Sequence, residues 1–456
     1  MKIGLFIGAL VGVFTIAAGA SAQRPWVKNR SHGEGMGIRT GNLELHPGLA
    51  LELGYDSNFL QRSGNQEYER EVSTFILRPS AELTLATLGP QRRAFDAGDG
   101  SPPSVTFRGG LATSYQEFLW ANREQEEIKS HRNLELQVGG NLDILPERPW
   151  GGDLVAEFRR AVSPTNSPEA QTAFVRDSLW VGPGITWRPG GGLFDWRWGY
   201  DLRLGFFEQT GQSKLNTVEH NAVTRGRWRF LPRSAVLFDA QLGFHSFPSN
   251  DQNVLNNSTP VRSRLGVRSL ITNHFGVMAL VGWGASFFEA THTPVQDFDS
   301  VIAHSEFTWY IMPQPHDAGD VATIGLSSVT LGYMRNFSQG FQASYTQMDR
   351  GYLSLAYSLA GSFVVLLDGG YTRYSYPVSY VDADSLRYRA YGEDRVDAQL
   401  FAEYRFSDVW GINSTLRYDA NLTETLMPIA AAEGQPDFDD LSFGRFQAFL
   451  GARWFL

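Results

Sequence analysis

The stretch from 194 to 207 constrains the fold more than any other part of the chain. It reads FDWRWGYDLRLGFF, with Trp196 and Trp198 on one set of alternate positions and Asp195 and Arg197 on the other. Successive side chains of an extended strand point to opposite faces, so this segment has one aromatic face and one charged face. A strand of this kind separates two different solvents.

The same two-residue alternation recurs from about residue 43 to the last residue, and helical periodicity never lasts longer than a turn or two. We therefore predict an all-β chain of about 18 strands, most of about 10 residues, which is the length of a tilted membrane-spanning strand. The predicted centres lie near residues 49, 80, 110, 139, 158, 181, 200, 226, 240, 266, 282, 306, 329, 355, 368, 401, 416 and 449.

The connections between these strands also alternate. Even strands are followed by brief turns rich in Pro and Gly, such as 188–192 and 231–234, and odd strands by longer polar segments, such as 56–70 and 248–260. Short periplasmic turns and long extracellular loops are typical of a transmembrane antiparallel up-and-down β-barrel. Residues 87–103 are an exception, a long segment expected on the periplasmic side. A propeller, a β-helix or tandem sandwiches would instead predict turns of similar length and internal repeats.

The N-terminus predicts export. Lys2 precedes an apolar run that ends in small residues, so we expect a signal peptide over residues 1–22, cleaved between Ala22 and Gln23. Residues 23–42 are glycine-rich and basic and are expected to form a periplasmic arm, with the barrel spanning 43–456. After the signal peptide no run of about 18 apolar residues predicts a membrane-spanning helix.

Composition excludes several classes of function. The chain has no cysteine, which removes disulfides, thiolate metal sites, cysteine nucleophiles and lipoprotein anchoring. Its formal net charge is −9 without a long basic run, so no nucleic-acid partner is expected. His46, His245 and His304 fall on different predicted strands, and no motif predicts a catalytic site, a metal site or a cofactor.

A barrel of about 18 strands is too wide for side chains to fill, so a water-filled lumen is expected. Its predicted charges are uneven, because arginines outnumber acids on strands seven to ten, whereas acids dominate on the opposite side. The candidate lumen charges are Arg197, Arg203, Arg225, Arg227, Arg229, Arg262, Arg264, Arg268, Glu44 and Glu52.

Two interpretations of these charges are open. A transverse field across a constriction would select solutes by charge, favouring anionic or neutral polar ones. Alternatively, acids on strands seven and nine simply pair with arginines on strands eight and ten.

Four aromatic residues are also expected to point inward: Trp180, Phe207, Tyr310 and Phe401. Aromatic faces can stack on sugars, so these residues are candidates for a path along which a carbohydrate slides. They can equally well pack under loops that fold into the lumen.

The last strand resembles the C-terminal assembly signal of bacterial outer-membrane barrels, with Gly451, Trp454 and Leu456 at the matching positions. It departs from that signal in ending on leucine, with phenylalanine one place earlier at Phe455, and in having Phe449 where a polar residue is usual. This resemblance implies the barrel-assembly machinery as a partner.

The mature chain as a whole resembles the outer-membrane β-barrel porins of Gram-negative bacteria, and LELHPGLALELGYDSN at 43–58 is similar to the opening of such chains, including myxobacterial ones. Some of those relatives resemble barrels that release exopolysaccharide together with a periplasmic export protein. The resemblance implies a pore in contact with outer-membrane lipid, with polysaccharide secretion as the most specific expectation. A general diffusion porin and a plugged adhesive barrel that binds partners through its loops are the alternatives.

Overall fold

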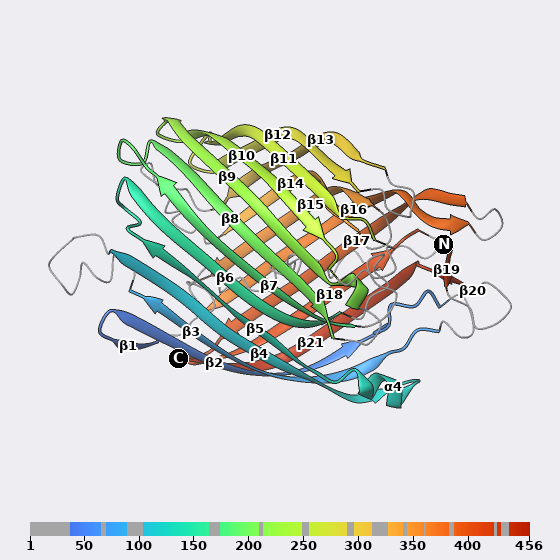
Figure 1. The fold of residues 1–456 in the computed structure, drawn as a ribbon. Helices are drawn as coiled ribbons and strands as arrows, with labels where there is room; N and C mark the ends of the chain where they lie inside the picture. Colours follow the sequence, from blue (N-terminus) through green and yellow to red (C-terminus); the bar gives the residue numbers. More distant parts are fainter. Residues whose placement is uncertain are drawn as a thin grey trace.

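The computed structural model describes residues 37–64, 70–88, 104–163, 174–208, 213–248, 255–289, 296–311, 327–340, 344–359, 362–382, 387–423, 426–429 and 437–456. Nearly all of these residues belong to antiparallel strands that run obliquely around a single closed cylinder (Figure 1).

The strands of the first half of the barrel are β2 (Leu43–Asp56), β3 (Thr74–Thr87), β4 (Val105–Ala121), β5 (Asn133–Ile144), β6 (Trp150–Ser163), β7 (Phe174–Trp187), β8 (Phe194–Phe207), β9 (Thr217–Leu231) and β10 (Ser234–Ser246). Those of the second half are β11 (Ser258–Leu270), β12 (Phe275–Phe288), β13 (Phe298–Tyr310), β14 (Ser328–Gln339), β15 (Tyr345–Leu359), β16 (Phe363–Asp382), β17 (Arg387–Arg405), β18 (Trp410–Asn421) and β21 (Phe443–Phe455). The smaller elements are β1 (Ile38–Thr40), α4 (Gln125–Ser130), η1 (Ser213–Leu215), β19 (Leu426–Ile429) and β20 (Asp437–Asp440).

Each barrel strand pairs with its neighbours in sequence, and β21 pairs with both β18 and β2, so the ring closes with 18 strands. The predicted up-and-down barrel is confirmed, and every predicted strand centre falls inside a strand of the ring. Many strands are longer than the predicted 10 residues, with 20 residues in β16 and 19 in β17. Among the described residues no helix is long and apolar enough to cross a membrane.

The connections define two ends of the barrel. The turn end carries the short connections, such as 145–149 and 232–233, and the loop end carries 57–73 and 122–132, with α4 (Figure 1). The predicted rule is wrong in three places by the bounds of the strands. β13 and β14 are separated by residues 311–327 at the turn end, whereas only 340–344 separate β14 from β15 and only 383–386 separate β16 from β17 at the loop end. The exception at 87–103 lies mostly outside the described residues; β3 ends and β4 begins at the turn end.

The outer face of the ring is apolar along its whole circumference. Leu450 is 66% exposed and Trp198 is 45% exposed, although both are large and hydrophobic. Near the turn end, Trp150 stacks on Trp187 and Trp198 at centroid distances of 6.0 and 6.5 Å. A closed ring pairs every strand edge, and an outer apolar band bordered by aromatic rings is the surface that lipid requires. The chain is an outer-membrane β-barrel, and Trp196, Trp198 and Tyr200 belong to its lipid-facing side.

A row of charged residues on the outer face marks the border of the apolar band that is nearer the loop end. Arg335, Asp349, Arg373 and Asp394 occupy directly opposite positions on β14–β17, on the same face as the exposed Tyr333. Arg335 Nη1 lies 3.3 Å from an Asp349 carboxylate oxygen, and Arg373 Nη1 lies 2.7 Å from an Asp394 oxygen. Outward charges are tolerated near the membrane interface and are costly at its middle, so the row indicates where the lipid tails end.

The seam that closes the ring involves three strands. The pairing of β21 with β2 ends at Gly48 opposite Phe455, and the amide of Leu456 donates to the carbonyl of Pro47 over 3.0 Å. Below that point β1 pairs with β2, with Ile38 opposite Leu45. This edge of β2 is therefore covered first by β1 and then by β21.

Candidate functional site

The inner wall formed by β7–β11 carries the predicted arginines. Asp195 forms an ion pair with Arg227, which is directly opposite on β9, and Arg264 on β11 makes bonds of 2.9 and 2.8 Å to the carboxylate of Asp239 on β10. These are the pairs between adjacent strands that the sequence suggested. Part of the charge on this wall is therefore neutralised locally.

The remaining arginines of this wall exceed its acids. Arg197 reaches back two strands to Asp153 on β6, with bonds of 3.0 and 2.6 Å. The guanidinium of Arg203 lies 5.5 Å from the ring centroid of Trp180. Arg203 also lies 4.0 Å from an Asp201 carboxylate oxygen, whereas the Arg225 side chain has no hydrogen bond or ion pair to another residue in the described part of the chain. The wall therefore keeps a net positive charge.

Two further arginines interact with neutral groups. The Arg268 guanidinium donates to the sulfur of Met278 over 3.4 Å, and that of Arg262 donates to a backbone carbonyl on β14. Arg229 lies on the same face of β9 as Arg225 and Arg227. The inward acids of β7–β11 are Asp195, Asp201, Glu219 and Asp239, which are fewer than the arginines.

On the opposite wall, around β2 and β18, the acids lie beside basic side chains. Glu44 is 2% exposed and lies 3.7 Å from the imidazole of His46. Glu52 forms an ion pair with Arg78 on β3, and Asp419 pairs with Arg417 within β18, at 2.7 and 2.6 Å. Arginines offset Glu52 and Asp419, whereas His46 offsets Glu44 only when it is protonated, so this wall has no positive surplus.

The four predicted lumen aromatics do not form one path. Trp180 and Phe207 lie on neighbouring strands β7 and β8, where the guanidinium groups of Arg203 and Arg176 lie over their rings. Tyr310 lies on β13 beside the turn end, and Phe401 lies on β17 and lines a cavity. Arginine side chains cover the rings of Trp180 and Phe207, so the four residues do not form a continuous aromatic surface along the lumen.

The loop end of β14 bends into the lumen, which the sequence did not predict. β13 continues to Phe298, but its pairing with β14 stops at Ala303 opposite Arg335. Beyond that point Phe337 stacks on Phe298 at a centroid distance of 4.1 Å, with Arg262 4.1 Å above its ring. Phe337 O also accepts a 2.7 Å bond from Arg262 Nη2.

The side chain of Gln339 links the same segment to β10 and β11, which lie beyond β12. Its side-chain oxygen accepts from Ser258 over 2.6 Å and also contacts the imidazole of His245, while its amide group donates to the carbonyl of Asn256 over 2.9 Å. Phe337 fits over Gly284, where a Cβ atom would lie 2.6 Å from the phenyl ring. The end of β14 (336–339) is called the inward segment below. It extends from the wall at β14 to contacts on β10 and β11, and it therefore narrows the lumen.

Another buried cluster fills the loop end near the seam. The connection after β2 places Phe59 edge-on against Phe118 at 4.9 Å, and Ile128 of α4 is buried beside them. The Arg445 guanidinium forms bonds of 3.1 and 2.5 Å to the carboxylate of Asp56, at the end of β2. These contacts hold the loop-end connections against the inner wall.

We predict that protonation of His131 at acid pH destabilises this cluster. Its ring lies 5.7 Å from that of Phe59, and burial lowers its pKa, with Glu127 opposing the shift. A histidine whose pKa is lowered by folding stabilises the structure fully above its ordinary pKa of about 6.5 and loses that contribution as the pH falls through the lowered value. Amide hydrogen exchange of residues 57–62 and 122–132 should therefore be several-fold faster at pH 5 than at pH 7.5, after correction for intrinsic rates.

A His131→Phe variant provides the control for this effect, because phenylalanine keeps the ring contact and cannot be protonated. Its exchange should no longer depend on pH in that range. The salt bridge of Glu124 with Arg62, at 2.7 Å, lowers the pKa of Glu124 and should persist through the same range. Equal acid sensitivity in the variant would assign the effect to another group.

The C-terminal residues lie in the closing strand. Gly451 faces Glu52 on β2, where a Cβ atom would lie 2.5 Å from the Glu52 side chain, and Trp454 is opposite both Leu49 and Trp410. Recognition of Gly451, Trp454 and Leu456 by an assembly machinery stays a prediction. The cleavage site at Ala22 and Gln23 lies outside the described residues.

Comparison with known proteins gives structural similarities of low sequence identity. No family model matches the chain, and no curated protein does. OpdK of Pseudomonas aeruginosa, solved with vanillate, has a TM-score of 0.44 at 10% identity, over 90% of this chain and 99% of that one. A BenF-like porin from Pseudomonas fluorescens Pf-5 has a TM-score of 0.44 at 9% identity, with the same coverage. The FrpB iron transporter of Neisseria meningitidis also has a TM-score of 0.44, at 7% identity, over 92% of this chain and 82% of that one.

Proposed function

We propose that this outer-membrane barrel is a passive diffusion channel for small hydrophilic solutes that favours anions over cations. Barrels with 16–18 strands leave an aqueous channel between their walls. The observation that carries the preference for anions is the surplus of arginine on the inner wall of β7–β11, where Asp239, the acid directly opposite Arg225, is bonded to Arg264 instead. Fixed charges that line a pore raise the local concentration of the opposite ion.

Secretion of a polysaccharide, the more specific expectation from the sequence, has less support than diffusion. The inward segment of β14 and the cluster around Phe59 both occupy the loop end, through which a secreted polymer would have to leave. A plugged adhesive barrel would conduct no ions. Reconstitution of the purified protein in planar bilayers separates this alternative from the channel, because a channel gives stepwise conductance increments.

Ion selectivity tests the proposal directly. In a KCl gradient the reversal potential should indicate a chloride preference, more strongly at low salt because screening weakens with ionic strength. The double variant Arg225→Glu and Arg268→Glu should move the permeability ratio several-fold toward potassium. Lys129→Glu on α4 is the control, because it reverses a charge at the loop end instead of in the lumen. A strong potassium preference of the unmodified protein would contradict the proposal.

A further inference from the structure

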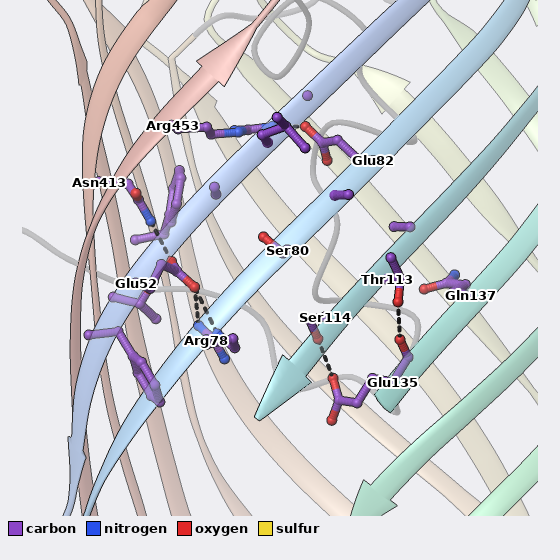
Figure 2. Close-up of a pocket in the computed structure, with 18 of the residues that line it drawn as sticks. Glu52, Arg78, Ser80, Glu82, Thr113, Ser114, Glu135, Gln137, Asn413 and Arg453 are labelled. Atoms are coloured by element: carbon purple, nitrogen blue, oxygen red, sulfur yellow. Dashed lines mark hydrogen bonds and ion pairs between the residues drawn. The ribbon is translucent and has the colours of Figure 1, made fainter. Parts of the chain in front are cut away.

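A cavity of about 230 Å³ lies on the side of the lumen away from the arginine wall. Its lining residues come from β2–β6, β17, β18 and β21, so it spans the closing seam. Figure 2 shows Glu52, Arg78, Ser80 and Glu135 around this space. Pockets for drug-sized ligands have volumes of about 300–1,000 Å³, so this one fits a smaller molecule.

The charged side chains around Glu52 already have partners. Arg78 Nε donates to one carboxylate oxygen of Glu52 over 2.7 Å, and Asn413 donates to the other over 2.6 Å (Figure 2). A charged ligand would have to compete with these contacts. Breaking these contacts would leave the buried Glu52 carboxylate uncompensated, which is unfavourable.

The same holds for the rest of the charged lining. Arg453 bridges Glu82 on β3 and Glu403 on β17, the latter at 2.8 Å. The other charged lining residues also have interaction partners: Glu135, Arg159, Arg160 and Arg417. Every charge of the cavity is thus engaged within the protein.

Neutral hydrogen-bonding groups in the cavity are unused. Among the described residues, the side chains of Ser80, Gln399 and Thr415 make no hydrogen bond to another residue. Phe401 stands directly opposite Thr415 on the neighbouring strand and shares the inward face of β17 with Gln399. Its ring has no aromatic or cationic neighbour in the described part of the chain. The cavity therefore offers one open aromatic face, bordered by amide and hydroxyl groups.

We propose that this cavity is a binding subsite for a small neutral polyhydroxylated solute, about the size of one sugar ring. This inference rests on the proposed channel function and names one class of solute that the channel takes. The apolar face of such a ring covers Phe401, while its hydroxyls bond to Gln399, Thr415 and Ser80. A neutral solute leaves the ion pairs of Glu52 and Arg453 intact.

Three probes of nearly equal shape and different charge test the proposal: D-glucose, D-glucuronate and D-glucosamine. Calorimetry on the full-length detergent-solubilised barrel should give binding of glucose about tenfold tighter than that of either charged probe. Phe401→Ala should weaken glucose binding about fivefold, through loss of the stacked ring. Trp180→Ala is the matched control, because Trp180 is an inward aromatic outside the cavity lining, and should leave glucose binding unchanged.

The outcomes separate this inference from the channel function. Equal binding of all three probes, no binding of glucose, or normal binding by the Phe401→Ala variant would overturn the subsite while ionic conductance stands. Glucose binding by a barrel that conducts no ions would overturn the channel and keep the subsite. Should Phe401→Ala fail to give a heat-modifiable folded band, Gln399→Ala removes a hydrogen-bonding group instead, and glucose binding should again weaken.

Discussion

Replacing Arg262 by alanine is expected to release the inward segment of β14 and to open a wider conducting state. The guanidinium donates to Phe337 O over 2.7 Å and covers the phenyl ring. A hydrogen bond from a charged group contributes about 2 kcal/mol, so its loss shifts the equilibrium toward the released segment roughly 30-fold. Single-channel recordings should show high-conductance openings more often by about that factor.

Arg264→Ala is the matched control for this experiment. Arg264 is two residues away on the same inward face of β11 and has the same charge, but its partner is Asp239 rather than β14. The control should alter ion selectivity without adding the high-conductance state. Identical recordings from both variants would mean that lumen charge, not the inward segment, sets the conductance.

Replacing Gly266 by alanine should impair folding of the barrel. A Cβ atom at Gly266 would overlap the carbonyl oxygen of Ala279 on β12, and one at Gly282 would overlap that of Ser263 on β11. These obstacles are backbone atoms, which cannot rotate away as a side chain can. Overpacking of this kind costs about 3 kcal/mol. The variant should lose its heat-modifiable band at a lower temperature and a lower urea concentration.

Gly351→Ala on β15 tests whether this effect is specific. No atom lies within 4 Å of a Cβ built at that position, so alanine is expected to be neutral or slightly stabilising there. If both variants unfold alike, the loss would reflect glycine replacement in general rather than the close approach of β11 and β12.

The barrel strands could be located from the sequence because their two faces meet different solvents. Trp198 on β8 is 45% exposed toward lipid and Asp201 is 5% exposed toward the lumen, and the same sorting operates around the ring except at the inward segment of β14. Strand length was less predictable, since β16 continues beyond the apolar band, where the contrast between the faces no longer applies. The long connection at 311–327 was also missed, because lipid imposes no length on a turn-end segment.

Side-chain contacts in the lumen were predictable only where the two residues are directly opposite on neighbouring strands. Asp195 and Arg227 are directly opposite on neighbouring strands, so strand order and alternation together suggest their pair. The contact of Arg197 with Asp153 spans two strands and depends on side-chain reach. Phe337 shares its alternate positions with the lipid-facing Tyr333, so the pattern assigns it outward. Its inward position arises from the separation of β14 from β13, for which the sequence has no local signal.

The short strand β1 has a consequence for the geometry of ring closure. In a closed β-sheet the stagger between the first and last strands sets the shear, and with it the tilt and the width of the cylinder. β1 and β21 share one edge of β2, in line with each other. If β21 shifted toward the turn end, it would have to displace β1 from β2. This three-residue strand therefore opposes a change of register at the seam, and with it a change in the diameter of the barrel.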